Sequence, residues 1–150
     1  KTIIDDNITY TPAQDEILMQ GERPQADYVA SANGEWVINL EEVKASKITE
    51  LKSARETEEL SPISYGGYLW DFDTYAQMRI NGAIVALGST NTVTWTSADN
   101  EEIKGVNADD LKGVIGSAAI RSDALHTKYR GLKELVENAE TVEDVEAVVW

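Results

Sequence analysis

The sequence predicts an α+β protein, in which short antiparallel strands pack with three or four helices. Three observations lead to this prediction. First, three turn signals each lie between short segments rich in β-branched and aromatic residues, which is typical of β-hairpins. Second, two long stretches repeat apolar residues every three or four positions, as amphipathic helices do. Third, apolar residues make up 42% of the chain, which is enough for a folded core.

These elements predict three parts along the chain. An N-terminal β-hairpin module is expected over residues 1–40, followed by a connector helix over residues 41–60. Residues 61–150 are expected to form an α+β domain, in which a small antiparallel sheet packs with a long helix and two shorter helices. The first half of this domain carries the least charge of the chain and is expected to hold the core strands.

The hairpin of the first part lies in YVASANGEWVIN, where alternating apolar residues surround the pair Asn33-Gly34. This pair predicts a tight type I′ turn, because both residues tolerate the positive φ that such a turn demands. A lone hairpin is marginally stable in water. We therefore expect Trp36 to pack on the rest of the chain, on a second copy or on a partner. Upstream, residues 3–4 and 8–10 suggest a short edge strand.

The connector helix is predicted from a narrow apolar stripe on a body rich in Lys and Glu. Ser61-Pro62 is expected to end it, because proline disfavours helical backbone in the residue before it. A stripe this thin fits an exposed helix, a short coiled coil or a connector, so the 41–60 helix is also a candidate for homo-oligomer formation. The stripe consists of Leu40, Val43, Ile48, Leu51 and Ala54.

The third part begins with PISYGGYLWDFD, which predicts a second hairpin that turns at Gly66-Gly67. Thr74 is placed to cap the helix that follows, and Gly88 is a natural stop for it. The apolar residues available for packing on this helix are Tyr75, Met78, Ile80, Ile84, Val85 and Leu87.

A third hairpin, a long helix and a short terminal helix complete the predicted fold. The segment TVTWTSADNEEIKGV places a Ser-Ala-Asp-Asn turn between two strands. Asn107 is expected to cap the long helix, with Asp110 at its third position, and Thr141 to cap the last helix. Gly113 and Gly116 lower the helix propensity, which favours close approach to another backbone at both positions.

The composition excludes several classes of partner and site. With 27 acidic and 13 basic side chains the net charge is −14, which disfavours binding to nucleic acid or to an anionic membrane surface. The absence of cysteine removes disulfides, thiolate nucleophiles and cysteine zinc sites. This fits assembly in a cytoplasm, although a disulfide-free secreted protein would look the same. No apolar run approaches the roughly 18 residues of a membrane helix. The start at Lys1 fits a missing initiator or a longer chain.

Histidine is the usual general base, and the sequence contains one, His126, on the long helix. Ser122 lies one helical turn before it. A serine–histidine pair needs an orienting acid and an oxyanion hole, and the sequence shows neither. His126 is therefore expected to be a boundary or surface residue.

Asp71 and Asp73, in WDFDT, allow two interpretations. On a strand they would share one face, where they could hold a hard cation or do acid–base work. In the interpretation we favour, Asp73 and Thr74 cap the next helix while Asp71 ends the strand. The segment ADNEE lacks the spacing of a calcium loop, and no glycine pattern matches a phosphate loop. The sequence thus predicts no catalytic residue, no metal site, no cofactor and no enzymatic activity.

Four tryptophans are the remaining residues of interest. Trp70 and Trp95 lie on the central strands, where a core position is expected. For Trp36 the sequence leaves open whether the ring packs inward on its own chain or outward on a partner. The fourth, Trp150, is the last residue.

RPQADYVASANGEWVINLEEVKASKITELKSAR, residues 23–55, resembles a segment of tailed-bacteriophage tail-fibre assembly proteins and related tail proteins. In that group an Arg-Pro pair precedes an aromatic-rich hairpin with a tryptophan, and a charged helix follows. Residues 61–150 resemble an uncharacterised domain found in phage and prophage tail proteins. The motifs that carry this second resemblance, in order, are YGGYLWDFDT, RINGAIVAL, VTWTSADNEEI and LHTKYRGLKELVENAETVEDVEAV.

The resemblance implies a non-enzymatic bacteriophage protein, namely a tail-fibre assembly chaperone that shields the fibre tip in the host cytoplasm during phage assembly. Its partner would be the tail fibre or another tail protein, with Tyr28, Trp36 and Val37 as candidate contacts. The alternative is a structural or receptor-binding component that stays in the virion tail. A third class, a carbohydrate-active or metal-dependent domain, would use Asp71 and Asp73.

Overall fold

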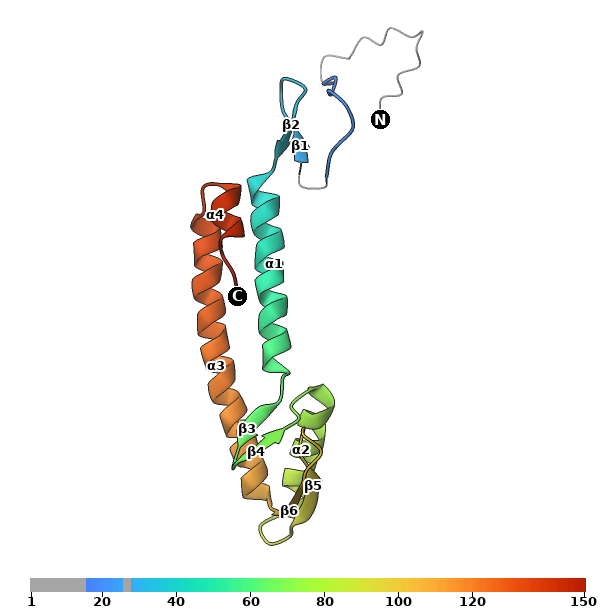
Figure 1. Ribbon diagram of the computed structural model, residues 1–150, viewed down its shortest axis with the longest axis vertical. Coiled ribbons are helices and arrows are strands. Elements are labelled where there is room, and N and C mark those ends of the chain that lie inside the picture. Colours follow the sequence, from blue (N-terminus) through green and yellow to red (C-terminus); the bar gives the residue numbers. More distant parts are fainter. Residues whose placement is uncertain (1–15, 26–27) are drawn as a thin grey trace. The chain divides into compact units, whose positions relative to one another are not determined.

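The computed structural model describes residues 16–25 and 28–150, and the edge strand expected over residues 3–10 lies outside them. The described residues form four helices and three two-stranded antiparallel sheets, which confirms the α+β class (Figure 1). The small antiparallel sheet predicted after residue 60 is thus divided into two separate hairpins. The chain divides into two compact units, Lys1–Ser46 and Lys47–Trp150, and the boundary falls within helix α1 (Leu40–Glu59).

The first hairpin pairs β1 (Tyr28–Ala30) with β2 (Trp36–Ile38). Its turn is at the predicted Asn-Gly pair, but the predicted type I′ geometry is wrong. Gly34 has φ 84° while Asn33 keeps a negative φ, so the connection is a three-residue loop with glycine in the left-handed region. The Gly34 N–H donates to the Ser31 carbonyl at 3.1 Å, which closes this loop.

The second hairpin pairs β3 (Ile63–Tyr65) with β4 (Tyr68–Trp70). Gly66 and Gly67 connect them, with φ 61° and 85°. Two consecutive residues with positive φ are the requirement of a type I′ turn, so the prediction for this hairpin is confirmed.

The third hairpin pairs β5 (Val93–Thr96) with β6 (Glu102–Val106) and repeats the loop of the first. The predicted Ser-Ala-Asp-Asn turn is confirmed. The Ser97 N–H donates to the Glu101 carbonyl at 2.9 Å, and Asn100 takes the left-handed position with φ 62°. The two loops read SANGE and SADNE, with the left-handed residue fourth in each.

The helices begin close to where their capping residues predict. Asp73 rather than Thr74 caps α2 (Thr74–Leu87), because its side chain accepts the Ala76 N–H at 2.7 Å. A complete capping box of Asn107 and Asp110 starts α3 (Ala108–Asn138), as predicted. The Thr141 side chain accepts the Asp144 N–H at the start of α4 (Val142–Glu146), which is also confirmed.

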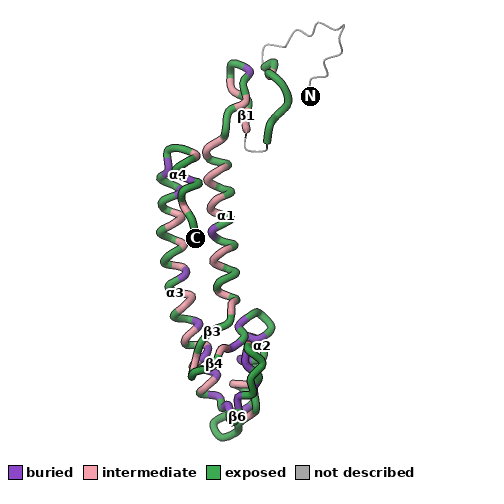
Figure 2. Tube along the Cα trace, viewed as in Figure 1, coloured by how far each residue is buried: buried purple, intermediate pink, exposed green. Residues whose placement is uncertain are grey.

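The hydrophobic core of the second unit forms where α2 and the first half of α3 meet β3–β6 (Figure 2). Trp70 and Trp95 are buried there with ring centroids 6.2 Å apart, so the core position predicted for both is confirmed. The core consists of Ile63, Trp70, Phe72, Ile80, Leu87, Trp95, Ile103, Val106, Ala108, Leu111, Val114 and Ala118.

Two glycines of α3 were predicted to allow close approach to another backbone, but one of them meets a side chain instead and the other meets no neighbour. A Cβ at Gly113 would collide with the ring of Tyr65, so glycine lets β3 lie against the helix at this point. At Gly116 a Cβ would meet nothing within 4 Å, and the prediction for this position is wrong. The sequence spacing alone did not show which glycine faces the hairpin.

The packing predicted for α2 is correct for only part of its apolar residues. Ile80 and Leu87 are buried, together with Ala76. Tyr75, Met78 and Val85 are instead exposed on another face of the helix. A helix of 14 residues with apolar residues on two faces has no single periodic signal that marks the inner one.

The centre of the apolar stripe predicted on α1 is buried within the chain's own fold. Leu51 is fully buried, while Ile48 and Ala54 are partly buried. The helix predicted over residues 41–60 is therefore confirmed, whereas homo-oligomer formation through it stays a prediction. The centre of its stripe belongs to the second unit and is buried there.

Candidate functional site

The strand register of the first hairpin separates the three residues predicted to contact a partner. Tyr28 lies opposite Ile38, and Trp36 lies opposite Ala30, so these four side chains share one face. Val37 lies one residue from Trp36 and points to the other face. Tyr28 and Trp36 are therefore brought together, and Ile38 joins them where the sequence had indicated Val37.

Trp36 is held against its own chain. Its ring is partly buried, and the indole Nε1–H donates to the carbonyl of Gly21 at 3.2 Å. The segment around Gly21 also meets the hairpin loop, where the Gln20 N–H donates to the Gly34 carbonyl at 2.9 Å. A Cβ at Gly34 would collide with the carbonyl oxygen of Leu18, so glycine is required here for contact as well as for its φ. Trp36 thus packs partly on its own chain, and its role as a contact for a partner stays a prediction.

The described part of the first unit nevertheless exposes several large apolar side chains, which we name the N-terminal apolar surface. Val37 and Ile38 are 42% and 40% exposed and contribute to it from opposite faces of the hairpin. Ile17 and Leu18 of the adjoining segment are also exposed. The sequence analysis missed these two residues, although they begin an apolar run, Ile17-Leu18-Met19, between Glu16 and Gln20.

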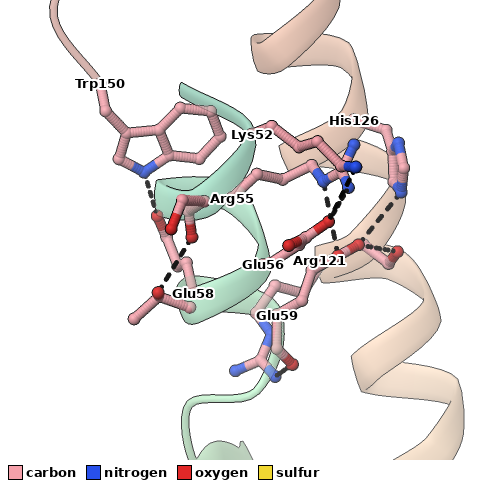
Figure 3. A network of polar contacts seen from close by, with 11 residues as sticks. Lys52, Arg55, Glu56, Glu58, Glu59, Arg121, His126 and Trp150 are labelled. Carbon is pink, nitrogen blue, oxygen red and sulfur yellow. Dashed lines mark hydrogen bonds and ion pairs between the residues drawn. The ribbon is translucent and has the colours of Figure 1, made fainter. Parts of the chain in front are cut away.

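A second group of interacting side chains lies in the other unit, between α1 and α3, and is centred on Glu59 (Figure 3). Glu59 Oε1 accepts the Ser122 hydroxyl at 2.8 Å and lies 3.1 Å from His126 Nε2. Its other carboxylate oxygen, Oε2, is 3.5 Å from Nε of Arg55, whose guanidinium stacks on the ring of Tyr129. The sequence missed Glu59 because it lies on another helix, more than 60 residues away from Ser122 and His126.

Arg121 extends this network to the end of α1. Its guanidinium donates to the carbonyls of Glu59 at 2.8 Å and Pro62 at 2.9 Å, and to the Ser61 hydroxyl. Desolvation by burial lowers the pKa of Arg121, while the negative charges of Glu58 and Glu59 oppose this effect. The group stays protonated, since arginine titrates far above neutral pH. Arg121 thus joins α3 to the end of α1 and to the two residues of the segment that leads to β3.

The geometry of the Glu59 cluster differs from that of a catalytic triad with a serine nucleophile. In a serine–histidine–acid triad the imidazole lies between hydroxyl and carboxylate and accepts the hydroxyl proton. Here the carboxylate of Glu59 lies between the other two groups, so the Ser122 proton is directed to Glu59 and not to His126. The boundary position predicted for His126 is confirmed, since the ring is partly exposed. The cluster joins α1 to α3.

Asp71 and Asp73 do not lie together on a strand. β4 ends at Trp70, so both aspartates follow it, and the shared strand face considered in the sequence analysis is wrong. Asp73 Oδ1 is occupied by the N-cap hydrogen bond to Ala76. In residues 16–25 and 28–150, no group of three His, Cys, Asp or Glu side chains is placed to hold a metal ion.

The last residue closes the helix pair. The Trp150 indole N–H donates to Glu58 of α1 at 2.8 Å (Figure 3). The Lys128 ammonium of α3 lies 4.2 Å from the ring centroid of Trp150. A cation over an aromatic face contributes about 0.5–1 kcal/mol at an exposed site. Trp150 therefore contributes to the α1–α3 junction and is not available as an outward-facing contact.

Comparison with known proteins gives a single finding about ancestry. Residues 42–149 match the family described as a domain of unknown function, DUF4376. No curated protein and no solved structure matches the chain. Within the described part of the chain, no helix combines the length and apolar character needed to cross a membrane.

Proposed function

We propose that the chain, which belongs to the DUF4376 family, is a non-enzymatic bacteriophage tail-associated protein that acts as a tail-fibre assembly chaperone. The partner is the tail fibre or another tail protein, not nucleic acid or a membrane. The protein works in the host cytoplasm during phage assembly. Two sequence resemblances underlie the proposal, one over residues 23–55 and one over residues 61–150.

The observation that carries the proposal is the N-terminal apolar surface of Ile17, Leu18, Val37 and Ile38. Four large apolar side chains are exposed within one small unit. Exposed apolar side chains are candidate contacts for a partner protein, and here they are available on both faces of the hairpin and on the segment before it. The surrounding chain is strongly acidic, with a net charge of −14, and this charge opposes aggregation through the apolar surface.

The mechanism is temporary shielding. Fibre tips expose apolar residues and strand edges before the fibre has assembled, and such surfaces associate prematurely. The N-terminal apolar surface covers them by apolar contact, or β2 adds to a free edge by main-chain hydrogen bonds. Trp36 and Tyr28 help to stabilise the hairpin through their contacts within the chain. They also keep Ile38 in position on the face that the three residues share.

The proposal is tested with the fibre protein encoded beside this chain in the same genome. We expect the variant V37D/I38D to weaken binding by at least about tenfold in calorimetry, because a charge replaces each apolar contact. Val149 is a matched control, since it is an exposed valine of the second unit. V149D is expected to bind as the unsubstituted protein does.

Equal binding by V37D/I38D and the unsubstituted protein would show that the N-terminal apolar surface is not the site. The composition of purified virions distinguishes the chaperone from a tail component. A chaperone is absent from mature particles, whereas a stoichiometric band would identify a structural or receptor-binding component of the tail.

A further inference from the structure

The end of α3 and the α4 segment form a groove in the second unit, which we name the terminal groove. α4 folds back on the end of α3 (Figure 1), and Val136 and Val145 are fully buried there. The groove beside this contact has a volume of about 610 Å³. Pockets of about 300–1,000 Å³ are large enough to bury a ligand. The lining of the terminal groove includes Leu132, Leu135, Glu140, Asp144, Val148 and Val149.

The apolar part of the terminal groove is open to solvent. Leu135 and Val149 are 59% and 69% exposed, while Leu132 and Val148 are partly buried. Leu132 and Leu135 are three residues apart, so they lie on the same side of α3. The groove therefore offers apolar contact to the alkyl groups of a partner.

Negative charge is concentrated around this apolar lining. Residues 134–146 contain six acidic residues and no basic one, and Lys133, just before them, is paired with Glu137 at 3.3 Å. Glu140 and Asp144 line the groove itself. The carboxyl end of a helix carries a partial negative charge that nearby cations stabilise, yet α3 has no basic residue in its last turn. The groove thus combines carboxylates with an uncompensated helix end, and both attract a cation.

We infer that the terminal groove binds a basic segment of a partner protein, in which Lys or Arg residues alternate with apolar ones. Lys and Arg have long apolar stems, which lie along Leu135 and Val149 while the charged head reaches Glu140 or Asp144. The apolar side chains of the segment fill the rest of the groove. This occupant satisfies both the apolar lining and the charge around it.

Two other occupants fit the terminal groove less well. A second copy of the chain would bring its own net charge of −14 to an acidic surface. A single metal ion needs several ligands that converge on one point, and no group of three His, Cys, Asp or Glu side chains in the described residues does so. A basic segment differs from both, because its positive charges are spread along a chain.

Fluorescence anisotropy tests the inference, with a labelled synthetic peptide of alternating lysine and leucine titrated with the full chain. We expect binding that weakens when salt is added, since salt screens the attraction between charges. Peptides with glutamate in place of each lysine, or serine in place of each leucine, are expected to bind at least about tenfold more weakly. Equal binding of the serine peptide would overturn the inference, because the net charge of the protein alone would then explain the attraction.

The apolar contact is tested by L135Q, which is expected to weaken peptide binding at least about fivefold. Ile120 of α3 is 75% exposed, and I120Q is the matched control with the same loss of an exposed apolar side chain. Glutamine and leucine have similar helix propensities, so L135Q keeps α3 folded. Equal peptide binding by L135Q and I120Q would overturn the inference.

The charged contact is tested by E140Q, which is expected to weaken peptide binding about two- to fivefold. Asp144 is left unchanged, because its side chain and N–H both bond to Thr141 at the start of α4. Glu102 is exposed on β6, and E102Q removes the same charge at a distance from the groove. Equal effects of E140Q and E102Q would show attraction to the whole protein rather than to this site, and would overturn the inference.

The inference does not rest on the proposed function, because the terminal groove lies in the second unit and the N-terminal apolar surface in the first. L135Q is expected to bind the fibre protein as the unsubstituted protein does. A loss of fibre-protein binding in L135Q with unchanged peptide binding would overturn the inference, since Leu135 would then serve a different partner.

Discussion

The first and third hairpins have the same kind of loop, but their strands differ in how far they are buried. Both loops begin with Ser-Ala and end with Glu, and both place their fourth residue in the left-handed region. In each, the serine hydroxyl accepts the N–H of the glutamate, at 3.1 Å from Glu35 and 2.9 Å from Glu101. The third hairpin buries Trp95 and Ile103 in the core. The first hairpin leaves Val37 and Ile38 exposed.

The comparison separates what a loop determines from what a strand determines. A five-residue sequence fixes the reversal and the pairing of two short strands, because its hydrogen bonds are local. It does not determine whether those strands have anything to pack on. The third hairpin lies against β4, where the Ala98 N–H donates to the Leu69 carbonyl at 2.8 Å, and thereby joins the core. Within the described residues, the first hairpin meets the segment around Gly21 and leaves Val37 and Ile38 exposed.

The largest expected difference between the hairpins is at their tryptophans. Trp95→Ala is expected to lower the free energy of unfolding of the second unit by about 3–5 kcal/mol, because it removes a buried ring from the core. Trp36→Ala is expected to change the free energy of unfolding of the second unit by less than about 0.5 kcal/mol. Urea unfolding followed by far-ultraviolet circular dichroism measures both. Similar losses for the two variants would contradict the distinction between a hairpin that is part of the core and one that is not.

The two loops can be compared further by exchanging the residues that have a positive φ, Gly34 and Asn100. Asn100→Gly is expected to change stability by less than about 1 kcal/mol, since glycine accepts a positive φ without strain. Gly34→Asn keeps a tolerated φ but collides with the carbonyl oxygen of Leu18. We expect a local cost of about 1–3 kcal/mol and detachment of the segment around Gln20.

Hydrogen exchange and the indole resonance of Trp36 report this detachment. The amide of Gln20 loses its protection, and the indole loses its hydrogen bond to Gly21. The matched variant Asn100→Gly leaves both signals unchanged. An unchanged Gln20 amide in Gly34→Asn would show that the segment does not depend on the glycine.

The sequence predicted those parts of the fold that depend on neighbours along the chain. The capping box of Asn107 and Asp110 and the glycine pair of the second hairpin are local signals, and both features are confirmed. The type of the first turn was missed because Asn-Gly also fits a longer loop, and Ser31 decides between the two through its bonds to Glu35.

The parts that could not be predicted depend on contacts between distant segments. No pattern around Ser122 and His126 indicates that Glu59 lies between them. The inner face of α2 was ambiguous because apolar residues occupy two of its faces, and only the position of β5 and α3 selects Ile80 over Val85. The candidate contacts Tyr28, Trp36 and Val37 all lie on the hairpin that the sequence predicted. The strand register was needed to show which of them share a face, because a shift of one residue would move the side chains to the opposite face.

The smallest expected difference concerns the two loop serines, and it tests whether the shared loop is energetically equivalent in both places. Ser97 is 3% exposed, so Ser97→Ala removes a buried acceptor and leaves the Glu101 N–H poorly satisfied. We expect a loss of about 1–2 kcal/mol in the second unit. Ser31→Ala is expected to cost at most about 0.5 kcal/mol, because water reaches the exposed loop and replaces the hydroxyl. Equal effects in urea unfolding and in exchange at Glu35 and Glu101 would show that the loops are stabilised by their own hydrogen bonds alone, and that burial of the third hairpin adds nothing at this position.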